Sequence, residues 1–458
     1  MITDTQKDKQ ENQDKQTLFQ SQLQAFYADI EESDALSRYR LKAWEHFLQI
    51  GLPTRRTDTY RYFPLNKFYD QSCYDPSKCN LKQQVSKETI ASYLLPECQG
   101  SCLVFINGLF SLDKSFLQNL PTNLVILPID EAMKTFQTHI ISQWAKSIKE
   151  ELDPFAALNL ALHRNGLYLY VPPNVEIKTP IQLLYLTNIN EPDALLMRPL
   201  LMPRVQGFIG RGATLNLVST HETISNASNN FNGNFNGVIF NGILDLAIEE
   251  NGSVYYTQSS PKPSGSWHFD ATRIVMKKDS KFTSVMASQG SVSHRHDYSA
   301  SLIGENVDLH LNGISYLQKN NKSHVNVLVN HEAPHCTSLQ LFKSAIADSA
   351  HAAFEGKIFV KRAAQKTEAF QLNNNLLLSD FAHADSKPNL EIFADDVKAS
   401  HGSTIGQLDE EQIFYMRTRG FSTATAKSLL VKGFCEEVIC KIPIDSLRKS
   451  LLQQFDEN

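Results

Sequence analysis

Histidine and cysteine are the residues of this chain best suited to bind a metal ion, and the sequence holds 14 histidines and 7 cysteines. One histidine stands apart from the others. His401, in Ser400-His401-Gly402, follows the last long alternating segment, residues 389–398, and precedes helical patterns that begin near residue 408. It therefore falls where a β-rich core should end and a helical segment should begin. A histidine at such an exposed end is free to bind a metal ion or to contact a partner chain.

Two denser groups of possible ligands occur earlier in the chain. His331-x3-His335-Cys336 combines imidazole and thiol donors, and it fits either a metal site or a position packed inside the β-rich core. Among the cysteines, Cys336 is the candidate for a thiol with a chemical role. His294-x-His296 would place both rings on one face of a strand, as chelation requires. The charged residues beside it fit a solvated turn equally well.

The sequence lacks the short motifs of several common enzyme classes. There is no Gly-x4-Gly-Lys-Ser/Thr loop, no Gly-x-Gly-x-x-Gly, no Gly-x-Ser-x-Gly and no His-Glu-x-x-His. Asp395-Asp396 resembles a catalytic pair, but neighbouring residues of a strand point to opposite faces. These two carboxylates are therefore predicted to lie in a turn or at a strand end, and we expect no catalysis by this chain alone.

The cysteines are few and scattered. They lie at positions 73, 79, 98, 102, 336, 435 and 440. The spacing of the first four fits no standard zinc finger, and the odd total argues against a disulfide scaffold. Buried free thiols are the simpler interpretation.

The elements that must position these residues are mostly strands. From about residue 101 to residue 403 the sequence has short, alternating, β-branched segments, such as 213–218, 307–311 and 325–329, separated by Gly, Asn, Asp and Ser turns. This pattern fits either a stack of sandwiches or barrels, or a parallel β-helix in which each coil pairs with the next. Irregular turn spacing favours the β-helix. Its open ends would carry unpaired strand edges, which need a cap or a partner.

Helical domains are predicted on both sides of this core. Residues 1–17 hold almost no apolar surface and are expected to be a disordered tail. Residues 18–100 form an N-terminal helical domain, because apolar side chains recur every three to four positions from Leu18 to Ile50. Residues 404–458 form a C-terminal helical domain, with Asp409, Ser422 and Asp445 as N-caps. These last helices would close the end of the β-rich core.

Composition excludes several classes of protein. The 44 basic and 49 acidic residues give a net charge of −5, so a broadly basic nucleic-acid-binding protein is excluded. No apolar run is long enough for a membrane-spanning helix, and residues 1–17 do not resemble a secretory signal. The cytoplasm is the expected compartment.

The C-terminal third closely resembles the core of the SufB/SufD family, the scaffold subunits of the SUF machinery for iron–sulfur cluster assembly. The similarity is carried by several ordered segments: Phe354-Glu355-Gly356-Lys357, Ala364-Gln365-Lys366-Thr367-Glu368-Ala369, Lys387-Pro388-Asn389-Leu390-Glu391-Ile392, Ser400-His401-Gly402-Ser403-Thr404, Gly406-Gln407-Leu408-Asp409-Glu410-Glu411 and Arg417-Thr418-Arg419-Gly420. Weaker similarity runs back through residues 155–167. Near the N-terminus, Gly51-Leu52-Pro53-Thr54-Arg55-Arg56-Thr57-Asp58 is similar to the opening of the SufD branch.

This resemblance implies an architecture and a set of partners. The fold would be mainly β, a right-handed parallel β-helix between helical N- and C-terminal domains. The chain would pair with SufB through the C-terminal end of the β-helix and would receive the ATPase SufC on its C-terminal helices. A homodimer is possible for the isolated chain. A nascent iron–sulfur cluster would form at the interface with SufB, and no cofactor would be bound by this chain alone.

The resemblance also implies roles for named residues. The histidine of the family's Ser-His-Gly motif maps onto His401, as a metal ligand at the cluster-assembly interface. SufD-like chains often carry cysteine two residues earlier, where this chain has Ala399. Phe414, Tyr415, Arg417 and Arg419 are candidates for docking the ATPase, although packing of their helix and complementing its dipole would explain them equally well.

Two alternatives differ in function. A SufB-type paralogue would share the fold, but the N-terminal similarity and the absence of cysteine from residues 389–401 favour the SufD branch. A β-helix enzyme that acts on polysaccharide would need carboxylates grouped on one strand face. Asp395-Asp396 does not meet that requirement.

Overall fold

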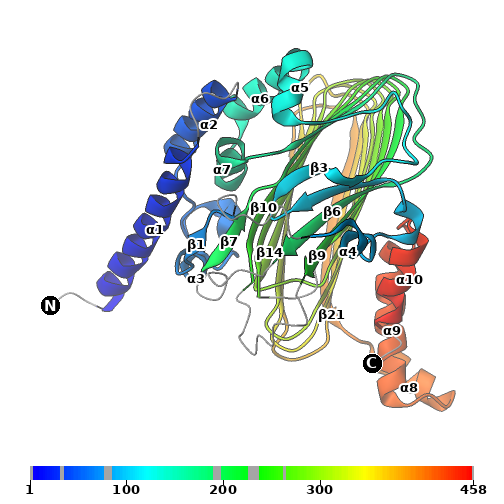
Figure 1. Cartoon of the computed structure of the whole chain (residues 1–458). Coiled ribbons are helices and arrows are strands. Elements are labelled where there is room, and N and C mark those ends of the chain that lie inside the picture. The colour runs from blue at the N-terminus through cyan, green and yellow to red at the C-terminus, as the bar shows by residue number, and fades with distance from the viewer. Residues whose placement is uncertain are drawn as a thin grey trace.

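The computed structural model describes residues 4–30, 36–76, 85–188, 197–224, 237–260 and 265–455, and its centre is a stack of parallel strands (Figure 1). The strands of the first half are β1 (Cys73–Tyr74), β2 (Cys102–Ile106), β3 (Leu109–Phe116), β4 (Val125–Pro128), β5 (Leu167–Val171), β6 (Ile181–Asn188), β7 (Arg198–Leu201), β8 (Arg204–Ile209), β9 (Thr214–Ile224) and β10 (Ile239–Ile248). Those of the second half are β11 (Ser253–Ser259), β12 (Trp267–Met276), β13 (Lys281–Ser288), β14 (Ser293–Leu302), β15 (Asp308–Leu317), β16 (Lys322–His331), β17 (Thr337–Ile346), β18 (His351–Val360), β19 (Thr367–Leu377), β20 (His383–Ile392) and β21 (Val397–Gln407).

Successive strands alternate between two sheets, and this alternation makes the stack a solenoid. One sheet runs β20-β18-β16-β14-β12-β10-β8-β5-β4, and the other runs β21-β19-β17-β15-β13-β11-β9-β6-β2-β3. Each coil lies in parallel register on the next, as where Asn312 pairs with Leu341 and Leu341 with Leu372. The predicted mainly β class and parallel β-helix core are confirmed.

The corners of the solenoid repeat more regularly than the turn residues of the sequence suggest. Five non-glycine residues in the left-handed backbone region stack one per coil: Asn251, Asp279, Asn306, His335 and Lys366. The backbone N–H of each donates to a carbonyl of the following coil. Asn and Asp tolerate positive φ better than most residues, which explains why they recur at these corners.

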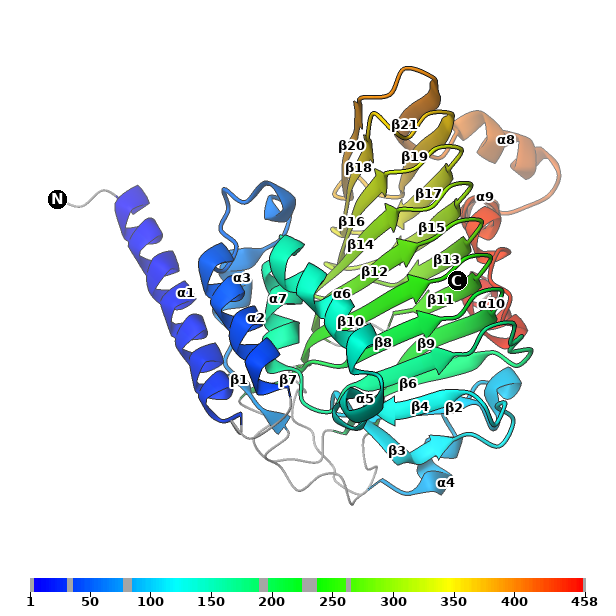
Figure 2. The same cartoon turned by 90° about the horizontal axis from the view of Figure 1, so that it is seen from above.

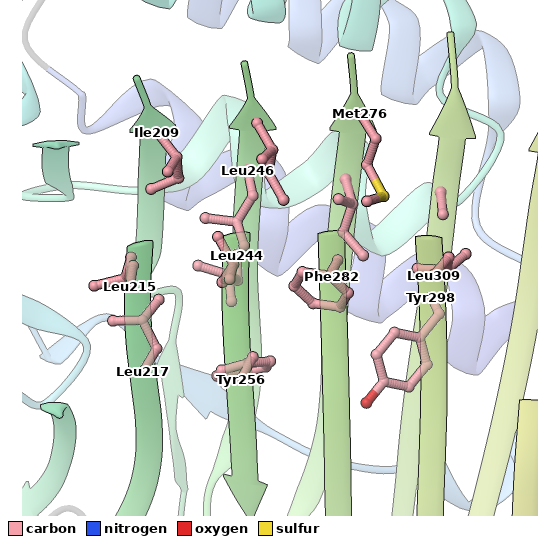
Figure 3. Close-up of a cluster of buried hydrophobic side chains, with 14 of the residues drawn as sticks. Ile209, Leu215, Leu217, Leu244, Leu246, Tyr256, Met276, Phe282, Tyr298 and Leu309 are labelled. Atoms are coloured by element: carbon pink, nitrogen blue, oxygen red, sulfur yellow. The ribbon is translucent and has the colours of Figure 1, made fainter. Parts of the chain in front are cut away.

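The interior of the solenoid is an apolar core built from the inward faces of both sheets (Figure 3). Leu215 and Leu217 of β9 lie beside Ile209 of β8 in one coil, and Leu244 and Leu246 of β10 lie beside Tyr256 of β11 in the next. Strand alternation puts every second residue on this inward face. At the N-terminal end the stack finishes in antiparallel pairs, β2 with β3 and β4 with β5.

Helices of the first half cover the outer face of the sheet that ends in β20. The short α4 (Lys87–Ala91) is an exception, because its Ile90 packs with Val104 and Leu184 of the other sheet. The helices on this face are α1 (Asp4–Ala28), α2 (Ser37–Ile50), α3 (Leu65–Tyr69), α5 (Ile129–Thr135), α6 (Gln137–Glu150) and α7 (Pro154–Leu162). Phe68, Phe155 and Trp144 bury their rings between these helices and the sheet. The core predicted for residues 101–403 therefore includes three helices, α5 to α7, before its strands become continuous.

A charged contact joins the N-terminal domain to the sheet. Arg295 of β14 is fully buried, forms two hydrogen bonds of 2.7 Å with the Asp297 carboxylate and lies 4.0 Å from the centre of the Tyr60 ring. The hydroxyl of Tyr60 in turn donates to Asp153 at 2.5 Å. Burial raises the pKa of Tyr60 far above its usual range, so this hydroxyl stays protonated.

The prediction of a disordered tail at residues 1–17 is wrong for residues 4–17, which are helical. Apart from residues 1–3, which lie outside the described part, that segment belongs to α1. Its Gln, Lys and Glu residues are good helix formers even without an apolar face. Phe19 and Leu23, farther along the same helix, are buried in the N-terminal core and anchor it.

The C-terminal helices do not close the stack, contrary to the sequence-based expectation. They are α8 (Glu410–Thr418), α9 (Thr423–Ile439) and α10 (Asp445–Gln453). Val431 and Val438 of α9 pack with Val285 and Ile314, which lie on the outer face of the sheet that ends in β21. Figure 2 shows α9 and α10 lying along this side of the solenoid. The reason is that α9 and α10 carry an apolar stripe that matches the side of the solenoid. The end formed by β20 and β21, called the open end below, is left uncovered by them.

The caps of these helices agree only in part with the sequence. Asp409 and Ser422 accept hydrogen bonds from the backbone N–H of Glu411 and Thr425, as predicted for N-caps. Asp445 is instead the first helical residue of α10, and Ile444 occupies the N-cap position. None of the described helices is both long and apolar enough to cross a membrane.

Candidate functional site

His401 lies at the open end of the solenoid, in the middle of β21. It pairs in register with Gln371 of β19, which is buried and faces the interior. Since side chains of paired residues share a face, His401 lies on the interior-facing side of its sheet, at the coil where the interior opens. Its side chain is exposed, and no hydrogen bond or ion pair joins it to the residues that the structure describes.

The open end presents two unpaired strand edges. β20 pairs with β18 and β21 pairs with β19, and neither has a second neighbour among the described strands. None of the 11 residues of β21 is buried. Large apolar side chains are exposed here as well: Phe370, Leu372, Phe381, Ile392, Phe393 and Ile405. The sequence predicted the unpaired edges but not this apolar group, because only the stacking shows which apolar side chains have no coil to cover them.

Helix α8 projects from the solenoid and exposes two aromatic side chains. Phe414 is 65% exposed and Tyr415 is 58% exposed, whereas Ile413 is the buried residue of the helix. Arg419 lies over the ring of Tyr415 and donates a hydrogen bond of 3.1 Å to its hydroxyl. Arg417 is exposed in the last turn, where a positive charge complements the helix dipole. Helix packing therefore does not account for Phe414 and Tyr415.

The three donors of His331-x3-His335-Cys336 do not come together. His331 is buried on β16 with Nε2 2.9 Å from the hydroxyl of Ser338. His335 occupies one of the left-handed corners and is exposed. Cys336 is fully buried, and its thiol donates to the carbonyl of Gly304 at 3.2 Å. Burial raises the pKa of Cys336, which disfavours the reactive thiolate.

His294 and His296 do share one face of a strand, but that face is the solenoid interior. Both are buried on β14, so the solvated turn considered from the sequence is wrong. Nε2 of His294 lies 2.9 Å from a carboxylate oxygen of Asp270 on β12. Burial opposes the charge of Asp270, but this hydrogen bond and the nearby histidines hold its pKa below the usual range. Asp270 was missed because it lies 24 residues before His294 and meets it only through strand register.

The structure gives the remaining candidate residues no clustered arrangement that indicates catalysis or metal binding among the described residues. Asp395 and Asp396 are exposed in the bend between β20 and β21, as predicted, and the backbone carbonyl of Asp396 accepts a hydrogen bond from the backbone N–H of Lys366. The six cysteines that the structure describes are all free thiols, and Cys440 is the exposed one.

Two family models and several known proteins match this chain. Residues 197–434 match the family model described as SUF system FeS cluster assembly, SufBD core domain, and residues 9–183 match the SufBD protein N-terminal region. An iron–sulfur cluster assembly SufBD family protein of Synechocystis is 30% identical over 436 residues, which cover 94% of this chain and 92% of the relative. Iron–sulfur cluster assembly protein SufD of Escherichia coli is 35% identical over 42% of this chain and 45% of its own length. The chloroplastic protein ABCI7 of Arabidopsis thaliana is 28% identical over 90% of this chain and 84% of its own length.

Proposed function

The chain belongs to the SufBD family of iron–sulfur cluster assembly proteins, and we propose that it is a SufD-type scaffold subunit of a SUF complex. It would pair with a SufB-type chain and receive a SufC-type ATPase, without catalysing a reaction of its own. The observation that carries this proposal is the open end, where two strand edges and the unpartnered His401 lie together.

Pairing through the open end follows from its chemistry. A strand edge presents unpaired N–H and C=O groups, and a long exposed edge is a template for another strand. A second solenoid of the same family has two such edges and can meet both at once. Exposed Leu372, Ile392 and Ile405 would add apolar area to the backbone hydrogen bonds.

His401 would contribute an imidazole ligand to the nascent cluster, which is the cargo of the complex. Iron–sulfur clusters are held mainly by thiolates. Ala399, two residues earlier on the same face of β21, supplies no thiol, and five of the six described cysteines are buried. The thiolates would therefore come from the partner chain, and imidazole is the donor that this chain offers at the open end.

Helix α8 is the proposed docking site for the ATPase. Exposed aromatic residues and arginine are enriched among the residues that dominate binding energy at interfaces. Such a group is formed by Phe414, Tyr415 and Arg417 on one short helix, together with Arg419 at its C-cap. Ile413, the buried residue of the helix, holds this group in place.

The cytoplasm is the compartment that we propose, although the Arabidopsis relative is described as chloroplastic. A SufB-type role is the second candidate. The absence of cysteine from β20 and β21 favours the SufD type, because a cluster shared across the interface needs its thiolates from the opposite chain.

Co-purification tests this function directly. The full chain is co-expressed with SufB-type and SufC-type chains from one operon, and we expect a complex that contains all three. Ile405→Glu, which places a charge on the edge strand, should weaken the pairing with the SufB-type chain. Leu152→Glu, an exposed apolar position on the loop between α6 and α7, is the matched control and should leave it intact. Recovery of the unmodified chain without either partner would contradict the proposal.

A further inference from the structure

A second group of possible metal ligands lies on the outer face of the solenoid, next to the open end. It comprises His351, the first residue of β18, with His383 and Asp385 of β20. His351 pairs in register with His383, and Asp385 lies two residues farther along on the same face. Sequence spacing hides the group, because 32 residues separate the two histidines and only the stacking joins them.

The two imidazoles converge on one carboxylate oxygen. Nε2 of His351 lies 2.7 Å from Oδ2 of Asp385, and Nε2 of His383 lies 3.4 Å from the same atom. The ring centres are 5.0 Å apart. A ligand atom from each of the three residues lies within 4.8 Å of those of the other two, which is compact enough for one ion to touch all three.

The group is open to solvent on one side and anchored on the other. The side chains of His351, His383 and Asp385 are 19%, 67% and 26% exposed. Lys322 of β16, in register with His351, adds a positive charge beside the group.

We propose that His351, His383 and Asp385 form a binding site for a divalent transition-metal ion. Two imidazoles and one carboxylate suit ions such as Fe²⁺, Co²⁺ and Zn²⁺, and they leave coordination positions open for water or a second ligand. Mg²⁺ and Ca²⁺ prefer oxygen ligands and are expected to bind poorly. In a SUF complex the ion would be ferrous iron held for cluster assembly, and this identity of the ion rests on the proposed function. The site lies on the edge strand β20 and its neighbour β18, at the end that would receive a partner, and this position agrees with such a role.

The chain contains a matched control for this site. His310 and Asp308 lie on the outer face of β15, with 3.0 Å between Nε2 and the carboxylate. Their side chains are 36% and 40% exposed. This pair has a similar distance between imidazole and carboxylate and is also partly exposed, but it has one imidazole instead of two. It should bind a transition metal far more weakly.

Metal titration of the tag-free, full-length chain tests the site. Co²⁺ is added under anaerobic conditions and followed by absorption and calorimetry, with Fe²⁺, Zn²⁺ and Mg²⁺ in parallel. We expect saturable binding of the transition metals, and His383→Ala should weaken the binding at least about tenfold, since even outer-shell partners of a metal are worth that much. His310→Ala should leave it unchanged. Lys322→Gln should strengthen it roughly two- to fivefold, because an opposing surface charge is removed.

The results separate this site from the proposed function. Equal losses in His383→Ala and His310→Ala, or no effect of either, would overturn the site, as would tight binding of Mg²⁺. If the chain binds the metal but never joins a SufB-type partner, the metal site is supported and the proposed function is contradicted. If the chain assembles clusters with its partners but binds no transition metal by itself, the proposed function is supported and the metal site is contradicted. In the intact complex, unchanged iron loading by His383→Ala would overturn the role in holding iron.

Discussion

His401 and His331 are histidines of the same solenoid in opposite surroundings, and their chemistry differs accordingly. His401 is exposed on the last coil, without a partner among the described residues, whereas His331 is buried within the stack. An exposed imidazole can bind a ligand at neutral pH. A buried one mainly limits the pH range in which the fold is stable.

Replacing His401 with alanine should lower cluster assembly without breaking the complex. The side chain makes no internal hydrogen bond, so the fold loses little when it is removed. We expect iron–sulfur cluster formation by the complex to fall roughly tenfold, as for loss of a metal ligand or its support. Absorption of the cluster during anaerobic reconstitution measures this. Ser403→Ala, on the same face of β21, is the control, and equal assembly by both variants would remove His401 from the site.

His331 should make the stability of the chain depend on pH. Burial lowers its pKa to about 4, whereas the unfolded chain has the ordinary value near 6.5. At pH 7 the ring is neutral in both states and contributes no pH dependence. As the pH falls from about 6.5 towards 4, the unfolded state takes up a proton that the folded state resists, so stability is lost, on the order of 3 kcal/mol.

Urea unfolding at pH 7 and at pH 4.5 measures this loss. The variant His331→Asn should show a smaller decrease in unfolding free energy between the two pH values than the unmodified chain. His335→Asn is the matched control, because His335 is exposed and asparagine tolerates its left-handed backbone. The same pH slope in His331→Asn and in the unmodified chain would contradict the assignment.

At this scale the sequence predicts features that depend on residues close together in the chain, and it does not predict contacts between residues that are far apart in it. The position of His401 was predictable because it needed only the order of segments along the chain. The contacts of His294 with Asp270 and of His351 with His383 were not, since residues in contact are 24 and 32 positions apart and meet by register. His335 was misleading for another reason: it serves as a left-handed corner, a position usually filled by asparagine or aspartate.

At the scale of elements, the segment around Tyr60 fixes the N-terminal domain on the first sheet through Arg295. Removing this arginine leaves the buried carboxylate of Asp297 without its charge partner. We expect Arg295→Ala to lower the unfolding free energy by about 3–5 kcal/mol. Chemical denaturation measures it, with Lys357→Ala as the control, since the ion pair of Lys357 with Glu391 is exposed and worth at most about 1 kcal/mol. Equal losses in the two variants would show that the buried pair has no special role.

Helix α8 offers the second prediction at this scale. Phe414→Ala and Tyr415→Ala should each weaken binding of the ATPase roughly tenfold, because exposed aromatic residues at an interface act as anchors. The fold should be unaffected, since both side chains are exposed. Calorimetry with the purified ATPase measures binding, and Leu48→Ala on α2 serves as an exposed apolar control. Unchanged affinity in both variants would place the docking site elsewhere.

Element types were more predictable than their placement. Helix N-caps are read from a few adjacent residues, and Asp409 and Ser422 indeed cap α8 and α9. The side of the solenoid on which α9 packs depends on Val285 and Ile314, more than a hundred residues away, which no local pattern shows. The predicted tail became part of α1 because the buried residues Phe19 and Leu23 hold the end of one continuous helix.

At the scale of the whole molecule, the two ends of the solenoid are unlike. The N-terminal end finishes in antiparallel pairs, and the long sides are covered by helices. The open end has neither kind of cover. In a solenoid each coil is stabilised by its neighbours, so a last coil with one neighbour is the least stable part. Its stability should therefore come from a partner, either a SufB-type chain or a second copy of this one.

Hydrogen exchange tests this difference between the ends. In the isolated chain at low concentration, the amides of β21 should exchange faster than those of β12 and β14, which are paired on both sides and mostly buried. Addition of the SufB-type chain should slow exchange in β20 and β21 and leave β12 and β14 unchanged, because an added strand supplies the missing hydrogen bonds only at the edge. A homodimer would give the same protection but with a dependence on the concentration of this chain alone. Protection that appears on α1 or α2 while β21 stays unprotected would show that the partner binds the covered side, and the open end would then lose its role as the interface.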